Sequence, residues 1–184
     1  MEKIASFTVN HELLEPGVYV SRRDTYPNTS YEVTTFDIRM CAPNREPVID
    51  TAALHALEHM GATYLRNNKA WASRVLYFGP MGCRTGFYLL LFGSYQTQDV
   101  VGLLCELFSS MATHEGTVPG ALPKECGNWH DSDLPMAKWW AKRFLEQTLL
   151  HIDNAHMNYP AEASENLHHS YKTKLNKNTL KRYI

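Results

Sequence analysis

The sequence predicts an α+β fold in a single domain. Its 184 residues are enough for one domain with a sizeable hydrophobic core. Segments that favour strands and helices alternate along the chain, but without the regular strand–helix–strand spacing of a doubly wound parallel sheet. The chain also lacks the glycine motifs of a P-loop or a dinucleotide-binding domain, and it has no internal repeat. These observations favour an α+β arrangement over an α/β fold.

Three strand-like segments precede the first helix. Residues 4–11 alternate apolar and polar side chains and end at a polar turn, so we expect a strand there. A short strand is expected at 18–22 and a longer one at 31–40. In the longer strand, Asp37 and Arg39 share the face opposite the apolar side chains. An Arg in this position is usually solvated or paired with a neighbouring Asp.

A helix and a hairpin follow. Asp50 or Thr51 can cap a helix over residues 52–66. Two apolar segments, 74–78 and 87–92, flank a turn that contains three Gly and one Pro. This composition is typical of a tight turn and predicts a hairpin.

Two more helices complete the predicted domain. Thr97 can cap a helix over 98–111. A loop follows, and the last strong helical pattern runs over 135–151 with a cap near Asp133.

Residues 161–184 differ from the rest of the chain. They are rich in Lys, Asn and His and have few large apolar side chains. We expect a polar surface tail, with one helical segment at most, outside a folded domain at 1–160. The pair His168–His169 could bind a metal, but adjacent His on a polar tail are usually solvated.

Composition and charge indicate an ordinary globular protein. Hydrophobic residues make up 44%, charged residues 20%, and the net charge is −1. This charge gives no reason to expect binding to nucleic acid or to an anionic membrane. No apolar run approaches the roughly 20 residues of a membrane helix, and we find no pattern of a secretory signal. We therefore expect a cytoplasmic protein.

The chain has four cysteines. In a reducing cytosol we expect thiols or metal ligands rather than disulfides. Cys41 and Cys105 have apolar neighbours and are predicted to lie in the core. Cys83 and Cys126 lie in turns flanked by Gly, which are better places for chemistry. Cys83 is either a buried turn thiol or a reactive one whose pKa is lowered by the guanidinium of neighbouring Arg84.

The segment His55-Ala56-Leu57-Glu58-His59 has the pattern H-x-x-E-H of inverted zincins. His55 and His59 lie four residues apart on the predicted helix, so both imidazoles can reach one metal ion. Glu58 lies on nearly the same face, where a carboxylate can transfer protons beside the metal. The alternative interpretation is a helix that carries two His by chance.

A catalytic metal site usually needs a third protein ligand and keeps one position open. Cys126 is the best candidate, because a thiolate suits Zn or Fe and Gly127 lets the backbone approach closely. His130 competes on spacing, and Glu125 is chemically possible. The pattern allows an inverted-zincin metallopeptidase, a different metal-dependent enzyme or a non-catalytic metal-binding protein.

Several segments together resemble the S-ribosylhomocysteine lyase (LuxS) family. They occur in family order and cover roughly residues 4–160. The segments are Ser6-Phe7-Thr8-Val9-Asn10-His11, Thr35-Phe36-Asp37-Ile38-Arg39, Ala42-Pro43-Asn44, His55-Ala56-Leu57-Glu58-His59, Gly79-Pro80-Met81-Gly82-Cys83-Arg84-Thr85-Gly86-Phe87-Tyr88 and Cys126-Gly127.

The resemblance implies a role for each matching residue. The implied metal ligands are His55, His59 and Cys126, and the implied acid/base groups are Cys83 and Glu58. The expected substrate-binding residues are Ser6, His11 and Arg39, to which we add Arg84. The implied metal is Fe(II), one per subunit, with Zn or Co as substitutes. The implied fold has an antiparallel sheet packed with helices, and the sheets of two subunits meet in a homodimer with shared active sites.

The implied reaction cleaves S-ribosylhomocysteine to homocysteine and 4,5-dihydroxy-2,3-pentanedione, the precursor of autoinducer-2. The C–S bond is at C5 of the sugar, far from the aldehyde at C1. The carbonyl must therefore migrate to C3 before loss of the C4 proton can expel homocysteine thiolate by β-elimination. Such a carbon–sulfur lyase would connect homocysteine recycling in the methyl cycle with autoinducer synthesis for quorum sensing.

The chain departs from the family pattern in two places. Tyr77 stands six residues before Cys83, where the family often carries Asp, so a carboxylate role does not transfer to this position. The tail at 161–184 has no counterpart, and no function transfers to it.

Overall fold

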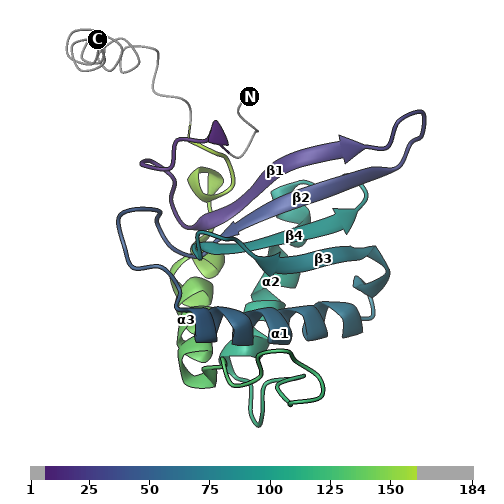
Figure 1. The fold of residues 1–184 in the computed structure, drawn as a ribbon. Helices are drawn as coiled ribbons and strands as arrows, with labels where there is room; N and C mark the ends of the chain where they lie inside the picture. Colours follow the sequence, from purple (N-terminus) through teal and green to yellow (C-terminus); the bar gives the residue numbers. More distant parts are fainter. Residues whose placement is uncertain (1–6, 161–184) are drawn as a thin grey trace, which may run out of the picture.

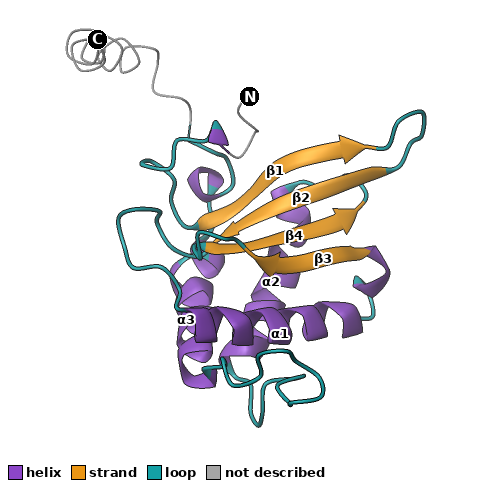
Figure 2. Cartoon of the chain, in the orientation of Figure 1, coloured by secondary structure: helices purple, strands orange, loops and turns teal. Residues whose placement is uncertain are grey.

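The computed structural model describes residues 7–160. Within these residues, four strands form one antiparallel sheet, and three α-helices pack on one side of it (Figures 1 and 2). The strand order is β1-β2-β4-β3. The prediction of a single α+β domain with an antiparallel sheet is confirmed. Ser6 and the tail at 161–184 lie outside the described residues.

The elements occur close to their expected positions. The strands are β1 (Gly17–Thr25), β2 (Glu32–Arg39), β3 (Val75–Pro80) and β4 (Gly86–Phe92). The helices are α1 (Thr51–Asn67), α2 (Thr97–Ala112) and α3 (Leu134–Gln147). Short 3-10 turns are η2 (Ala72–Arg74), η3 (Leu149–His151) and η4 (Asn154–His156). Strands β3 and β4 form the predicted hairpin.

The hydrophobic core lies between the sheet and the helices. One face of the sheet contributes the buried side chains of Phe36, Ile38, Phe78, Phe87 and Leu89, and the helices contribute Leu57, Leu104, Phe108 and Phe144. Each such side chain contributes about 1.5–3 kcal/mol on burial. Cys41 is buried in this core as predicted, whereas Cys105 is only half-buried.

The prediction of a strand at residues 4–11 is wrong for residues 7–11, the part that the structure describes. Residues 7–11 form turns, and Phe7 is 69% exposed. Asn10 explains the difference, because its side chain accepts a hydrogen bond from the Glu12 amide and its carbonyl accepts one from the Leu13 amide. Such local bonds compete with strand pairing.

Two helix ends differ from expectation. Gln96, not Thr97, caps α2, and it forms a reciprocal capping box with Asp99. The Thr97 hydroxyl is buried and donates to the Val18 carbonyl instead. Helix α3 ends at Gln147 rather than at 151, and the chain continues in a 3-10 turn. Asp50 and Asp133 cap α1 and α3 as expected.

The second face of the sheet carries polar as well as apolar side chains. In the register of β1, β2 and β4, Asp37 lies between Tyr19 and Tyr88, and Arg39 lies opposite Gly86. The chain after α3 reaches this face, where the ring of Tyr159 stacks on that of Tyr19. Among the described residues, no helix is both long and apolar enough to cross a membrane.

Candidate functional site

Helix α1 holds two imidazoles on one side. Asp50 begins the helix by accepting a hydrogen bond from the Ala53 amide. The apolar stripe of α1 packs in the core, which leaves His55 and His59 half-buried on the adjoining face. Their ring centroids are 4.6 Å apart. The spacing of four residues therefore places both rings beside the same point in space, as predicted.

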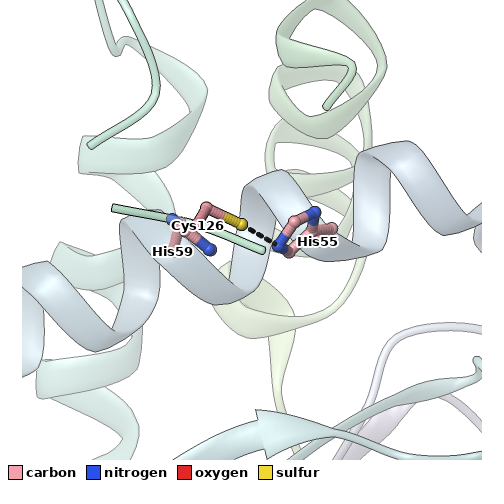
Figure 3. Close-up of side chains that lie close together, drawn as sticks. All are labelled: His55, His59 and Cys126. Atoms are coloured by element: carbon pink, nitrogen blue, oxygen red, sulfur yellow. Dashed lines mark hydrogen bonds between the residues drawn. The ribbon is translucent and has the colours of Figure 1, made fainter. Parts of the chain in front are cut away.

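Cys126 brings a thiol to this pair from the loop between α2 and α3 (Figure 3). Its Sγ lies 3.4 Å from His55 Nε2. The donor atoms of His55, His59 and Cys126 all lie within 4.8 Å of one another. In the described part of the chain, neither His130 nor Glu125 joins this cluster.

Backbone carbonyls orient both imidazoles. His55 Nδ1 donates to the Asp131 carbonyl at 2.7 Å, and His59 Nδ1 donates to the Pro119 carbonyl at 2.8 Å. Because a carbonyl can only accept, each Nδ1 carries the proton and each Nε2 keeps its lone pair. This arrangement is typical of metal-ligating His.

Gly120 allows the loop to approach His59. Its φ of +72° lies in the left-handed region, and a Cβ there would lie 3.0 Å from His59 Nδ1. Glycine adopts this conformation at little cost, whereas an Ala in its place would be strained. The close approach keeps the carbonyl of the preceding Pro119 within hydrogen-bond distance of His59.

The three donors fit a divalent transition metal. Two imidazole nitrogens and one thiolate suit Zn or Fe, and three protein ligands leave one position for a substrate oxygen. Glu58 is on the same helix, three residues after His55, and its side chain is half-buried. Its carboxylate is not among the clustered donor atoms of the described residues, so its proton-transfer role beside the metal stays a prediction.

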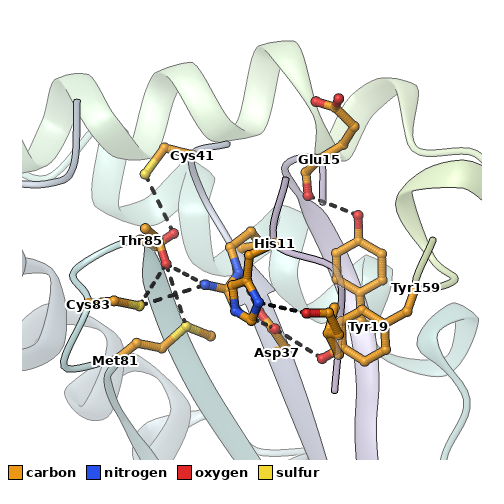
Figure 4. A network of polar contacts seen from close by, with 11 residues as sticks. His11, Glu15, Tyr19, Asp37, Cys41, Met81, Cys83, Thr85 and Tyr159 are labelled. Carbon is orange, nitrogen blue, oxygen red and sulfur yellow. Dashed lines mark hydrogen bonds and ion pairs between the residues drawn. The ribbon is translucent and has the colours of Figure 1, made fainter. Parts of the chain in front are cut away.

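Cys83 lies in the turn between β3 and β4, where its side chain is exposed, so it is not the buried turn thiol of the alternative interpretation. The turn is held by hydrogen bonds from the Met81 amide to the Gly86 carbonyl and from the Arg84 amide to the Met81 carbonyl. The thiol contacts the Thr85 hydroxyl at 3.0 Å (Figure 4). It also accepts from Arg39 Nη1 at 3.8 Å.

These contacts lower the pKa of the Cys83 thiol. Burial of the sulfur raises its pKa, but hydrogen bonds from the side chain and backbone of Thr85 and the charge of Arg39 outweigh that effect. The cation is therefore Arg39 from β2, and not the sequence neighbour Arg84 that we expected. The register explains this, because Arg39 lies opposite Gly86 at the start of β4.

Arg39 is itself fixed by a buried ion pair. Its Nε donates to Asp37 Oδ1 at 3.1 Å and its Nη2 to Asp37 Oδ2 at 2.6 Å. Both side chains are buried. The two parallel bonds set the plane of the guanidinium. Tyr159 also donates its hydroxyl proton to Asp37 Oδ2, at 3.0 Å (Figure 4).

The structure thus brings the predicted site residues into two groups, the three metal donors and the Arg39–Cys83 pair. His11 is half-buried in a turn and donates from Nδ1 to the Val9 carbonyl at 2.8 Å. The Arg84 carbonyl accepts from the Ile49 amide. The substrate-binding roles of His11 and Arg84 stay predictions, and Ser6 is outside the described residues.

The sequence pattern did not predict two residues of the Cys83 environment, Thr85 and Tyr159. Thr85 stands two residues after Cys83 in the family-like segment Gly79–Tyr88, so its position is a usable signal. Tyr159 has no comparable signal, because 122 residues separate it from its partner Asp37.

Comparisons with known proteins point to one family. A sequence model described as S-Ribosylhomocysteinase (LuxS) matches residues 4–155. A protein of Clostridium beijerinckii named S-ribosylhomocysteine lyase is 57% identical over 160 residues, which cover 87% of this chain and 99% of that protein. Proteins of the same name from Borreliella afzelii and Phocaeicola vulgatus are 51% and 49% identical, and the matches cover 87% and 88% of this chain and 100% and 99% of theirs.

Proposed function

The chain belongs to the S-ribosylhomocysteinase (LuxS) family, and from this premise we propose that it is a metal-dependent carbon–sulfur lyase that cleaves S-ribosylhomocysteine. The convergence of His55, His59 and Cys126 donor atoms within 4.8 Å carries the proposal. The products are homocysteine and 4,5-dihydroxy-2,3-pentanedione, the precursor of autoinducer-2. The C–S bond at C5 breaks only after the sugar carbonyl has moved from C1 to C3.

His55, His59 and Cys126 hold the metal through two Nε2 atoms and one Sγ. When bound, the metal supplies Lewis-acid polarisation of the substrate carbonyl. We propose Fe(II), one per subunit, with Zn or Co as substitutes, because this donor set accepts each of these ions. The Nδ1 protons, held by the Asp131 and Pro119 carbonyls, keep both rings in the ligating tautomer.

Cys83 and Glu58 move the protons. In each carbonyl shift, one proton leaves a carbon and another is returned to the adjacent carbon, first between C2 and C1 and then between C3 and C2. In the last step the C4 proton is removed and homocysteine thiolate leaves C5. The lowered pKa of the Cys83 thiol supports a role as a base near neutral pH.

Arg39 lies beside Cys83 with a fixed guanidinium plane. We assign to it the orientation of substrate hydroxyls and support of the thiolate. His11, Ser6 and Arg84 complete the proposed substrate-binding set. Tyr77 replaces the common family Asp, so any carboxylate contact at that position is absent from this chain's site.

We also propose a homodimer with shared active sites. The sheet face opposite α1, α2 and α3 exposes apolar side chains, including Tyr77 and Phe92. Arg39 projects from the same face as Leu90 and Phe92, since the three positions alternate in register across β2 and β4. A second subunit that covered this face would therefore lie next to Cys83. The proposed compartment is the cytoplasm.

The test is anaerobic purification followed by metal analysis and an assay of free thiol release from S-ribosylhomocysteine. We expect one metal per subunit, thiol release by the loaded protein, and loss of release after chelation. Casein hydrolysis is the comparison reaction for a metallopeptidase. Metal-loaded protein that hydrolyses casein, or that releases no thiol, would overturn the proposal.

A further inference from the structure

The Thr85 side chain occupies the centre of the polar network around Cys83. Thr85 is only 3% exposed. Among the described residues, its hydroxyl oxygen has three polar neighbours. Two are Cys83 Sγ at 3.0 Å and Met81 Sδ at 3.9 Å (Figure 4). The third is Arg39 Nη1. One hydroxyl thus connects the guanidinium to the reactive sulfur.

The chemistry of these neighbours sets the direction of each hydrogen bond. A guanidinium can only donate, so the Thr85 oxygen accepts from Arg39. The single hydroxyl proton then remains for a sulfur atom. Cys83 Sγ is nearer than Met81 Sδ by about 0.9 Å and becomes the stronger acceptor when it is a thiolate.

The backbone of Thr85 holds the hydroxyl in place. Its carbonyl accepts from the Met40 amide at 2.9 Å and from the Cys41 amide at 3.3 Å. The next residue, Gly86, lets β4 approach β2, because a Cβ there would lie 1.9 Å from the Ile38 carbonyl oxygen. Thr85 is therefore anchored against the strand that supplies Arg39.

We propose that Thr85 is a positioning residue that directs its hydroxyl proton onto Cys83 Sγ and that takes its own orientation from Arg39. The proposal deepens the proposed function, because it rests on Cys83 as an acid/base group. The order of donors is Arg39 to Thr85 to Cys83. Removal of the hydroxyl leaves the thiolate with the more distant Arg39 Nη1 and its backbone contact.

Several titratable groups surround Cys83. Arg39 from β2 favours the thiolate. Cys41, which follows β2, has its pKa raised by burial to about 11, and burial also raises the pKa of Tyr88 on β4. Both groups are thus neutral near pH 7. Asp37 is paired with Arg39, and Arg84 adjoins Cys83 in the turn.

The test is a pH titration of the Cys83 thiolate by its ultraviolet absorbance in the full chain, with Cys83→Ala subtracted as background. Thr85→Val should move the midpoint up by about one pH unit, because a hydrogen bond to the charged form is lost. Thr85→Ser keeps the hydroxyl and should stay near the wild-type midpoint. Met81→Leu removes only the distant sulfur and should change nothing.

Thr85→Ala gives a second removal of the hydroxyl if Val disturbs the packing, and circular dichroism reports folding for each variant. In the lyase assay of the variants without the hydroxyl, the acidic limb of the plot of kcat against pH should shift to higher pH by the same amount as the titration midpoint. KM should stay within about twofold of the wild-type value. Equal midpoints for wild type, Thr85→Ala and Thr85→Ser would overturn the role of Thr85.

Failure of the proposed function gives a different result. If the wild-type protein released no thiol from S-ribosylhomocysteine, the proposed reaction would be refuted, but the pH titration of Cys83 could still be measured. Thr85 would then still support the thiolate if the midpoint rose in Thr85→Val. Conversely, the wild-type protein could release thiol while Thr85→Val and Thr85→Ala leave the midpoint of the Cys83 titration unchanged. That result would keep the proposed function and refute the positioning role of Thr85.

Discussion

Tyr159 donates its hydroxyl proton to Asp37 Oδ2 over 3.0 Å, although 122 residues separate the two in sequence. The Tyr159 ring also stacks on Tyr19, with centroids 4.7 Å apart and planes inclined by 10°. Burial is the main reason why the pKa of Tyr159 is raised, and the charge of Asp37 adds to it, so the phenol stays protonated and able to donate. The segment after α3 thus supports the Asp37–Arg39 pair beside Cys83.

Tyr159→Phe should therefore destabilise the protein while keeping the stacked ring. The buried Asp37 carboxylate loses a donor, and a hydrogen bond to a charged group contributes about 1.5–3 kcal/mol. We expect the free energy of unfolding, measured in denaturant, to fall by about this amount. Tyr26→Phe is the control, because Tyr26 is 71% exposed and its change should stay within about 0.5 kcal/mol. Equal effects of the two substitutions would contradict the prediction.

Cys83 and Cys41 should react with iodoacetamide at very different rates. Only a thiolate reacts. The exposed Cys83 has a lowered pKa, whereas burial raises the pKa of Cys41 to about 11. At pH 7 the thiolate fraction of Cys41 is therefore about one in ten thousand. Mass spectrometry should find Cys83 alkylated at least about a hundredfold faster.

The two rates should also depend differently on pH. The alkylation rate of Cys83 should rise until the pH passes its lowered pKa and should then become constant. Alkylation of Cys41 keeps rising until pH passes about 11. Cys83→Ala identifies which peptide carries the fast reaction. Fast labelling of Cys41 at neutral pH would show that its environment is not as the structure describes.

The sequence predicted those parts of the site that depend on local periodicity. The spacing of His55 and His59 and the cap at Asp50 are readable because a helix repeats over short distances. The turn at Cys83 is readable because Gly and Pro mark tight turns. Cys126 needed the chemistry of its thiolate and the family resemblance, since no local pattern connects it to α1.

Contacts between distant segments were not predictable in the same way. Arg39 reaches Cys83 through the pairing of β2 with β4, which the sequence alone does not specify, so Arg84 looked like the nearer cation. Tyr159 reaches Asp37 only because the chain after α3 returns to the sheet. The strand expected at 4–11 failed at residues 7–11 because the hydrogen bonds of Asn10 are local.

Gly120→Ala should weaken metal binding. The left-handed φ of +72° strains any other residue, and the new Cβ would lie 3.0 Å from His59 Nδ1 and displace its contact with the Pro119 carbonyl. Loss of such a supporting contact typically costs 10- to 100-fold in metal affinity, and we expect about that loss here. Competition with a chelator measures it without reference to activity.

The matched control for this change is Gly116→Ala. Gly116 also has a left-handed φ, +89°, but a Cβ there would meet nothing within 4 Å. It should share the backbone strain and leave metal affinity unchanged. If both variants lost metal equally, the loss would come from loop strain and not from His59.

Glu58→Gln should give a metal-loaded but nearly inactive protein. The amide keeps the size of the side chain but cannot accept and release a proton, and general acid/base catalysis contributes about 10²–10⁴-fold. We expect kcat for thiol release to fall in this range. Glu146→Gln, on the exposed side of α3, is the charge-matched control. Loss of metal from Glu58→Gln would instead make Glu58 a ligand or a folding residue.

Phe92→Glu should separate the proposed dimer. Phe92 is 50% exposed at the end of β4, on the sheet face opposite α1, α2 and α3. Burial of such a side chain in an interface contributes about 1.5–3 kcal/mol, so a charge there should raise the dimer dissociation constant by at least about tenfold. Leu150→Glu makes the same charge change at a side chain that is 60% exposed after α3 and should leave the assembly intact.

Sedimentation measures the mass of the assembly that each variant forms, and the lyase assay measures how dissociation changes the activity. Because Arg39 projects from the same sheet face as Phe92, separation of the subunits should remove the partner from beside Cys83 and lower kcat/KM together with the dimer fraction. Addition of more protein should restore both by mass action. A monomeric Phe92→Glu variant with full activity would mean that each subunit carries a complete site and that the sites are not shared.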